Sequence, residues 1–391
     1  MLTWYINPDD GGQARYAAEC TEEAAGAYVI ETSLLPREAS SQREQLARRL
    51  AAQDSSIDIM SLDPPFMPEF AVPGFLAPVP EDMKDLEGNT QGAIDAASWD
   101  GEVVAIPFWA NTQLLWYRVS VAEAAGLDMT APVTWDQIIE AAESQGATIG
   151  AQGQRGESLT VWINALIESA GGQILENPEA PADELQLGLD SEAGAEAARI
   201  MRDINDKGLG GAGFTTADEN ASMVLFQQDN GGFMVNWPFV YPATQGAAPE
   251  VFADMGWAVY PAVTEGEPSA PPVGGIVLGV GAYSQHPDLA YEAVACITTL
   301  ERQVDYFLTN GNPPALEAAY DDPQLLEEFP GAQTIRDSLN QAAPRPQTPY
   351  YNEISLGLQN TWHPISQVDP ETTPARSTEF ITQVLRGEAL L

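Results

Sequence analysis

Few residues of this chain carry the side chains that reactive or metal-binding sites usually require. There are two histidines, His286 and His363, and two cysteines, Cys20 and Cys296, among 391 residues. A zinc site of the usual nitrogen and sulfur type needs several such ligands close together, and triad-type nucleophilic catalysis needs a histidine base. We therefore predict no catalytic residue, no metal site and no cofactor.

One glycine-rich stretch, residues 208–213, matches the G-x-G-x-x-G pattern of dinucleotide-binding loops. Such a loop works where a strand leads into a helix, because its glycines let the backbone approach the phosphates. Here the stretch follows a predicted helix over 192–207, so we predict a turn between helices. The chain also lacks G-x-S-x-G, Walker A and HExxH motifs, which disfavours a redox or nucleotide-dependent enzyme.

The charge balance argues against further classes of protein. Fifty-seven acidic and 16 basic residues give a net charge of −41. Such a chain repels nucleic-acid phosphates and anionic lipid headgroups. No apolar run reaches the roughly 18 residues that a membrane helix needs, and a length of 391 residues favours two domains.

Strands and helices alternate at the start of the chain, which indicates an α/β fold. The predicted order is strand 1–8, helix 14–25, strand 28–32, helix 42–53 and strand 57–62. Ligands of open α/β sheets bind beyond the carboxyl ends of the strands, where Asp9, Asp10 and Asp63 follow the first and third strands here. A surface turn equally explains Asp9 and Asp10, and a helix cap before Pro64 equally explains Asp63.

Several further stretches have a characteristic order and spacing. They are the helix and strand of 43–63, GEVVAIP at 101–107, LLWYR at 114–118, AAGL at 124–127, PVTWD at 132–136, MVNW at 234–237 and PVGG at 272–275. Together they resemble the extracellular sugar-binding proteins of ABC importers, the family that includes maltose- and trehalose-binding proteins. The branch they resemble most is the trehalose- and disaccharide-binding lipoproteins of actinobacteria.

The resemblance implies a two-lobed periplasmic-binding-protein fold, the Venus-flytrap arrangement, in which two α/β lobes joined by a hinge close on a sugar in the cleft between them. Lobe one would hold residues 1–113 and 280–325, and lobe two residues 118–275 and 330–391. The hinge crossings would lie near 111–118, 275–280 and 325–330.

The resemblance also implies the ligand-binding side chains. Aromatic rings cover the apolar faces of a sugar, while carboxylates, amides and an arginine fork bind its hydroxyls. Trp109, Trp237 and Phe239 are predicted to lie in loops beside prolines, although aromatic residues more often pack in cores. The full predicted set is Asp9, Asp10, Gln42, Arg43, Asp63, Trp109, Asn111, Trp237, Phe239, Gly274, Gly275 and Arg345.

The two cysteines allow either a long-range disulfide or two unrelated buried thiols, and their spacing alone does not decide. The family's chain path returns both of their helices to lobe one, so the resemblance implies a Cys20–Cys296 disulfide and an oxidising compartment. The chain opens directly on a strand, without a signal peptide or a lipid-accepting cysteine. We expect either a cytosolic protein or the mature part of an extracytoplasmic precursor that is lipid-anchored, and the resemblance favours the second.

The leading hypothesis is therefore a monomeric, non-catalytic solute-binding protein that delivers a sugar to the permease of an ABC importer. The predicted ligand is a neutral di- or oligosaccharide, with trehalose or another α-linked glucose disaccharide first. Some relatives have a carboxylate where Asn111 stands, so the exact sugar stays open. The alternative is a glycoside-processing enzyme that uses paired carboxylates.

Overall fold

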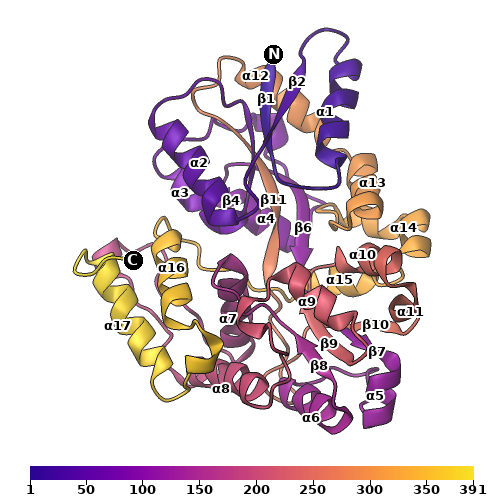
Figure 1. Cartoon of the computed structure of the whole chain (residues 1–391). Helices are drawn as coiled ribbons and strands as arrows, with labels where there is room; N and C mark the ends of the chain where they lie inside the picture. The colour runs from indigo at the N-terminus through magenta and orange to yellow at the C-terminus, as the bar shows by residue number, and fades with distance from the viewer. The chain divides into compact units, whose positions relative to one another are not determined.

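The chain forms two compact α/β units in the computed structural model, which describes all residues from 1 to 391. The first unit contains residues 1–111, 274–340 and 347–349, and the second contains 112–273, 341–346 and 350–391. The colours of Figure 1 show the indigo N-terminal strands beside orange segments from far along the chain. Neither unit is therefore one continuous stretch of sequence.

The end of the first unit differs from the expected boundaries. The sequence predicts residues 330–391 in the second lobe, but α15 (Ala332–Leu339) belongs to the first unit, as does α14 (Pro323–Glu328). The Gln333 amide donates a hydrogen bond to the Tyr320 carbonyl, 2.8 Å away, and holds α15 in that unit. The last crossings lie within 340–350 rather than at 325–330.

The first unit is built on a five-stranded sheet in the order β2-β1-β3-β11-β6. These strands are β1 (Leu2–Ile6), β2 (Ile30–Leu34), β3 (Ile59–Leu62), β6 (Ile106–Thr112) and β11 (Val273–Val280). Strand β1 runs parallel to β2 and β3, whereas β11 runs antiparallel to β3. The carboxyl ends of β1 and β3 thus meet at one edge, as the sequence predicts.

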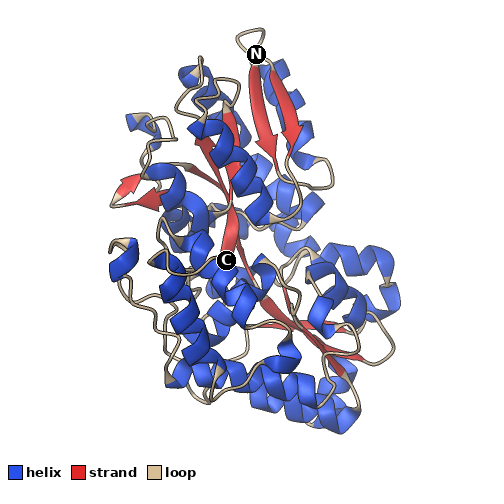
Figure 2. Cartoon of the chain, turned by 60° about the vertical axis from the view of Figure 1, so that its left-hand side comes forward, coloured by secondary structure: helices blue, strands red, loops and turns tan.

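Helices cover both faces of this sheet. Leu2, Trp4 and Ile6 alternate along β1 and pack in one cluster with α1 (Gly12–Glu23), α12 (Pro287–Ile297) and α13 (Leu300–Asn310). Helices α2 (Ala39–Ala51) and α3 (Met67–Ala71) lie on the other side (Figure 1). Helix α4 (Gln91–Ala97) leads into a small hairpin of β4 (Ser98–Trp99) and β5 (Glu102–Val103), which stands apart from the sheet in Figure 2.

Cys20 of α1 and Cys296 of α12 form a disulfide within the first unit. Their sulfur atoms are 2.09 Å apart, their Cα atoms are 6.0 Å apart, and they are separated by 276 positions in the sequence. The bond joins the first helix of the chain to a helix that follows the whole central segment of the second unit.

The second unit has a four-stranded sheet in the order β10-β7-β9-β8. The strands are β7 (Leu114–Arg118), β8 (Thr148–Gly150), β9 (Gly231–Asn236) and β10 (Met255–Ala258). The helices are α5 (Val119–Ala125), α6 (Trp135–Gln145), α7 (Glu157–Ser169), α8 (Glu192–Asp206), α9 (Glu219–Phe226), α10 (Val240–Ala247), α11 (Pro249–Phe252), α16 (Tyr351–Thr361) and α17 (Thr373–Leu385).

Local sequence signals set several of these boundaries. A capping box starts α6: the Gln137 backbone N–H donates to Thr134 Oγ1 at 3.2 Å, and the Thr134 backbone N–H donates to Gln137 Oε1 at 2.8 Å. The glycine-rich residues 208–213 form the predicted turn, between α8 and the short helix Phe214–Thr216. They therefore have no role as a dinucleotide-binding loop.

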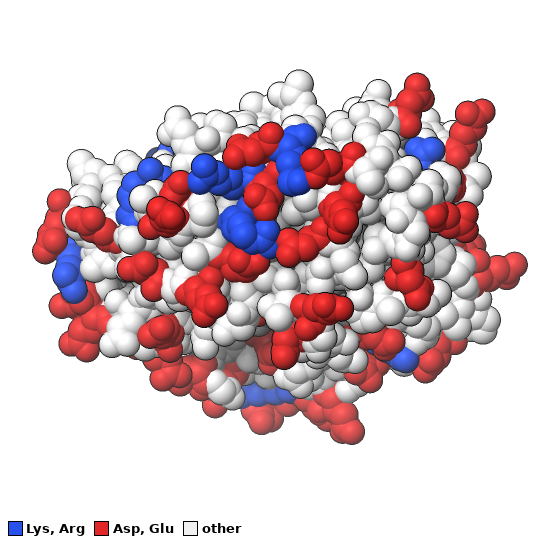
Figure 3. Space-filling model, turned by 90° about the horizontal axis from the view of Figure 1, so that it is seen from below, with Lys and Arg blue, Asp and Glu red and all other residues white.

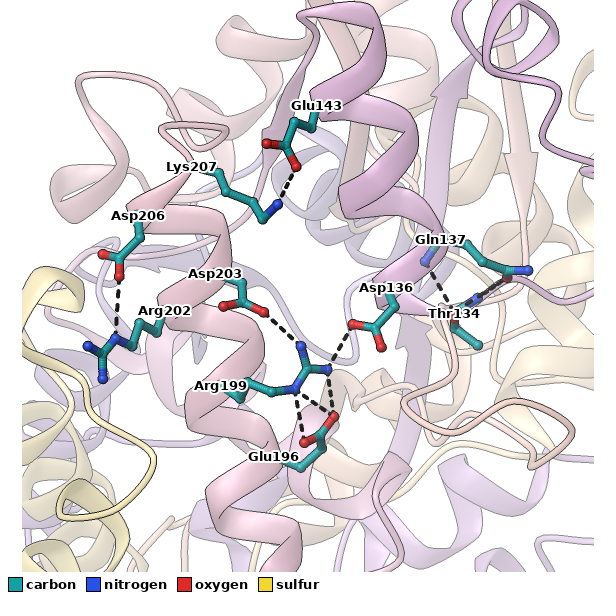
Figure 4. A network of polar contacts seen from close by, with 10 residues as sticks. All are labelled: Thr134, Asp136, Gln137, Glu143, Glu196, Arg199, Arg202, Asp203, Asp206 and Lys207. Atoms are coloured by element: carbon teal, nitrogen blue, oxygen red, sulfur yellow. Dashed lines mark hydrogen bonds and ion pairs between the residues drawn. The ribbon is translucent and has the colours of Figure 1, made fainter.

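The few basic side chains lie among acidic ones. On the face of the chain shown in Figure 3, blue basic groups gather beside red acidic groups. Figure 4 shows one such group of charges between α6 and α8. Arg199 contacts Glu196 on its own helix, and it also lies 2.7 Å from Asp203 and 2.8 Å from Asp136. Lys207 likewise pairs with Glu143. These cations are neutralised locally and do not form a phosphate-binding patch.

Candidate functional site

Asp9 is fixed at the start of α1, beyond the end of β1. Its Oδ1 accepts a hydrogen bond from the Gly11 backbone N–H at 3.0 Å, and its Oδ2 accepts one from the Gln13 backbone N–H at 2.8 Å. Both bonds satisfy N–H groups that a helix N-terminus leaves unpaired. Asp10 is exposed, and only its backbone N–H makes a described bond, to Asn310. Of the two neighbouring carboxylates, Asp9 has the fixed geometry that a binding group needs.

A chain of buried polar groups lies behind Asp9. The Tyr306 hydroxyl contacts Asp9 Oδ2 at 3.1 Å and Gln13 Nε2 at 3.3 Å. Gln13 Oε1 accepts from Ser61 Oγ at 3.2 Å, and Ser61 Oγ accepts from the Trp4 indole N–H at 3.0 Å. Burial, and then the charge of Asp9, raise the pKa of Tyr306 well above its usual value, so its hydroxyl stays protonated.

Trp109 lies within strand β6 and not in the predicted loop. Its ring centroid is 4.9 Å from that of Phe108 and 5.1 Å from that of Tyr306, and it is 8% exposed. All seven residues of β6 are buried, and its apolar run continues through this tryptophan, so the strand extends past Pro107. Trp109 is therefore part of the hydrophobic core of the first unit, with a small part of its surface accessible.

Gln42 and Arg43, the two candidates on α2, already have partners within the first unit. Gln42 Oε1 accepts from Asn7 Nδ2 at 2.8 Å, and Gln42 Nε2 donates to the Pro36 carbonyl at 2.7 Å. Arg43 forms a two-pronged ion pair with Glu69 of α3, with Nε 2.6 Å from Oε2. Gln42 thereby holds Asn7 at the end of β1, and the Arg43 charge is neutralised.

The remaining candidates of the first unit lie at strand ends and crossings. Asp63 occupies the cap position before the short helix Pro64–Phe66 but makes no side-chain cap bond. Asn111 is the last residue of β6 that belongs to the first unit, and Gly274 is the first residue of β11 that belongs to it. Gly275 has φ of +113°, and a Cβ there would lie 2.2 Å from the Trp109 carbonyl oxygen. The close packing of β11 on β6 therefore explains this glycine without a ligand.

In the second unit, Trp237 and Phe239 follow strand β9, in the predicted loop, and both are half-buried. The Trp237 backbone N–H donates to Asn236 Oδ1 at 2.9 Å, and Asn236 Nδ2 donates to the Glu219 carbonyl at 2.8 Å. Burial raises the pKa of the Glu219 carboxyl, and the Trp237 side chain acts against this larger effect by lowering it. Asn236 and Glu219 together hold the tryptophan between β9 and α9.

Arg345 is engaged in a buried ion pair. Its Nη1 lies 2.7 Å from Oε1 of Glu157, the first residue of α7. The Glu157 carboxylate also accepts hydrogen bonds from the Tyr351 hydroxyl and from Ser355 Oγ, the latter at 2.7 Å. Arg345 therefore links residues 341–346 to α7, and its role as a donor to a ligand stays a prediction.

Sequence reasoning missed four polar residues that hold these groups: Gln13, Glu157, Glu219 and Tyr306. None belongs to a recognisable motif, and each reaches its partner through the fold. Burial raises the pKa of the Glu219 carboxyl, and the charges of Asp218 and Glu157 raise it further. Glu219 thus combines a perturbed pKa with a contact to a candidate ligand residue, which is a physical signal of a functional site.

The structure contains no cluster of three or more histidine, cysteine or acidic side chains placed to hold a metal ion. None of its helices combines the length and the apolar character that crossing a membrane requires.

Residues 30–304 match the family described as bacterial extracellular solute-binding protein. The chain belongs to this family. A probable ABC transporter-binding protein of Deinococcus radiodurans is a relative that is 24% identical over 363 residues, covering 88% of this chain and 83% of the other.

Solved structures with a similar fold match nearly the whole chain. Maltose-bound MalE3 of T. maritima is 25% identical, with a TM-score of 0.84 over 99% of each chain. The GacH receptor of Streptomyces glaucescens, solved without ligand and with acarbose, has 19% identity and a TM-score of 0.80, over 99% of this chain and 97% of the other. The chain thus has the two-lobed α/β fold of periplasmic binding proteins, as the sequence predicts.

Proposed function

We propose that this protein is the solute-binding component of an ABC sugar importer and that its ligand is a neutral di- or oligosaccharide. Trehalose or another α-linked glucose disaccharide is the first candidate. The observation that carries the proposal is the membership of the family, together with the similarity to maltose-bound MalE3 over 99% of both chains. At 25% identity this similarity extends to the sequence as well as the fold.

The partners of the candidate residues support a neutral ligand. Both arginines of the predicted set, Arg43 and Arg345, are paired with carboxylates, Glu69 and Glu157. A phosphorylated or acidic sugar needs cationic donors whose charge is not already balanced. Trp237 and Phe239 supply aromatic surface for the apolar faces of sugar rings.

We further propose that the two units close on the sugar, with the Asp9 loop contributed by the first and Trp237 by the second. A ligand that contacts both units shifts the protein towards its closed state. Small-angle scattering should then give a smaller radius of gyration with the sugar than without it.

The proposal includes a monomeric protein that acts outside the cytoplasm, is lipid-anchored in its precursor, and delivers the sugar to permease subunits. It also includes the absence of enzymatic activity. Incubation with trehalose, maltose and sucrose, followed by chromatography, distinguishes it from the alternative of a glycoside-processing enzyme. Glucose release that depends on the protein would favour the enzyme.

A thermal-shift screen against disaccharides tests the proposed ligand class. A ligand that binds only the folded protein stabilises it and so raises its melting temperature. At a free ligand concentration a hundred times Kd, the added stability is about 2.7 kcal/mol. Calorimetry on each positive sugar then gives the affinity. A preference for a sugar phosphate or an amino acid over every neutral sugar would overturn the proposal.

A further inference from the structure

Tyr306 contacts two residues of the predicted binding set in the first unit, Asp9 and Trp109. It lies on α13 and is 1% exposed, and its ring is 5.1 Å from both Phe108 and Trp109, centroid to centroid. Its hydroxyl, at the other end of the side chain, is 3.1 Å from Asp9 Oδ2. One rigid side chain therefore connects the aromatic surface of Trp109 to the carboxylate of Asp9.

The hydrogen bonds behind Tyr306 have only one consistent direction. The Trp4 indole N–H can only donate, so Ser61 Oγ accepts from it and donates its own proton to Gln13 Oε1. Gln13 then presents its NH₂ group to the Tyr306 oxygen. The Tyr306 proton is thereby directed to Asp9 Oδ2, which can only accept while ionised.

Three donors hold the Asp9 carboxylate: two backbone N–H groups, of Gly11 and Gln13, and the Tyr306 hydroxyl. An ionised carboxylate accepts about four hydrogen bonds, so about one acceptor position is left for a ligand hydroxyl. The direction of that position is set by the other three bonds. Removal of the Tyr306 hydroxyl would leave two acceptor positions and a carboxylate that is free to tilt.

The first unit is closely built around this tyrosine. A Cβ on Gly12, the first residue of α1, would lie 2.6 Å from Tyr306 Cε2, so only glycine fits. Helices α1 and α13 are also tied by the ion pair of Arg15 with Asp305 and by the Tyr16 hydroxyl, which donates to the Arg302 carbonyl at 2.9 Å. Tyr306 is therefore held in one place.

We propose that Tyr306 is a positioning residue for sugar recognition: its hydroxyl orients the Asp9 carboxylate towards one sugar hydroxyl, while its ring supports the Trp109 indole. This inference rests on the proposed function and extends it, since it assigns hydroxyl selectivity to a side chain that need not touch the sugar.

The test compares Tyr306→Phe with Tyr291→Phe. Both remove a buried hydroxyl of the first unit, but the Tyr291 hydroxyl donates to the Ala77 carbonyl at 2.7 Å and contacts no candidate residue. Calorimetry with the best neutral disaccharide should show affinity reduced about tenfold in Tyr306→Phe, the usual scale for a hydrogen bond to a charged group, and unchanged in Tyr291→Phe.

A merely structural role of Tyr306 would not change selectivity among sugars. With a panel of monodeoxy derivatives of the disaccharide, wild type should bind at least one derivative about tenfold more weakly than the parent. In Tyr306→Phe, removal of the same sugar hydroxyl should weaken binding threefold or less. In an Asp9→Asn background, Tyr306→Phe should have no further effect, because the two residues act as a unit.

Each outcome is decisive. A wild-type protein that binds no neutral sugar overturns the proposed function and this inference with it. A wild type that binds, with Tyr306→Phe equal to Tyr291→Phe in affinity and selectivity, overturns the inference alone. If Tyr306→Phe does not fold, Gln13→Met removes the hydrogen bond from Gln13 to the Tyr306 hydroxyl, and unchanged selectivity in that variant equally overturns the inference.

Discussion

Arg345 and Glu157 form a buried ion pair in the second unit, with Nη1 of the arginine 2.7 Å from Oε1 of the glutamate. Their side chains are 3% and 9% exposed. Because Glu157 begins α7 and also accepts from Tyr351 and Ser355 of α16, the pair ties three segments together. Arg345 therefore has a structural role whether or not it also contacts a ligand.

Arg345→Ala should destabilise the protein by about 3–5 kcal/mol, because it leaves a buried carboxylate without its cation. Urea denaturation measures the loss as a lower midpoint at constant slope. Arg48→Ala is the control, since Arg48 is exposed and pairs with Glu44 on the surface of α2; its midpoint should match wild type. An Arg345→Ala protein with normal stability and weakened sugar binding would contradict the structural role.

Trp237→Ala should abolish most of the sugar affinity and leave the melting temperature of the free protein nearly unchanged, because Trp237 is half-buried after β9. The matched variant is Trp135→Ala. Trp135 is 1% exposed and packs against Trp162 and Tyr260 at centroid distances of 6.1 and 5.9 Å. Its removal should cost about 3–5 kcal/mol. If Trp237→Ala melts like Trp135→Ala, Trp237 is a core residue.

The disulfide predicts an oxidised protein with no titratable thiol. Denatured, unreduced protein should give zero free thiols per chain. The Cys20→Ser, Cys296→Ser double variant should lose about 3–5 kcal/mol, since the bond closes a very long loop of the unfolded chain. The control is wild type with reductant, which should approach the stability of the double variant. Two thiols in the unreduced wild type would contradict this pairing.

Glu168 of α7 predicts an unusual pH dependence of stability. Burial raises the pKa of its carboxyl to about 7, against 4.5 as the ordinary value. A raised carboxyl pKa stabilises the folded state below pH 4.5, and that contribution is lost as the pH rises through 7. Glu168→Gln should therefore stabilise the protein at pH 8 relative to wild type, by up to about 3 kcal/mol, and have little effect at pH 4.5.

The measurement for Glu168 is the denaturation midpoint between pH 4.5 and pH 8. Glu140→Gln, which changes an exposed carboxylate of α6, should give a curve parallel to wild type. A Glu168→Gln curve that also runs parallel to wild type would mean that water reaches this carboxyl.

Local patterns predicted most elements of the fold. The capping box at Thr134 and Gln137 needs only neighbouring residues, and the periodicity of 42–53 is visible in the sequence itself. The partners of the candidate residues were not predictable in this way. Tyr306 lies 297 positions from Asp9, and Arg345 lies 188 positions from Glu157, so no local pattern reveals either contact.

Trp109 shows the same limit of local reasoning. A tryptophan two residues after a proline suggests a loop, but strand β6 runs through both residues and is paired with β11 at the edge of the sheet. The packing of Trp109 on Tyr306 depends on a helix almost two hundred residues later in the chain. Sequence reasoning could select this aromatic residue but not its surroundings.

Strand β11 lies between β3 and β6 in the first sheet. In the sequence, however, residues 113–272 of the second unit separate it from both of these strands. During synthesis, the first 111 residues hold four of the five strands but lack the one that joins β6 to the others. The missing strand is complete only after residues 112–280, another 169 residues, have been added. At roughly 5–20 residues per second this takes roughly 10 to 30 s. The five-stranded sheet of the first unit can therefore be completed only after most of the second unit has been synthesised.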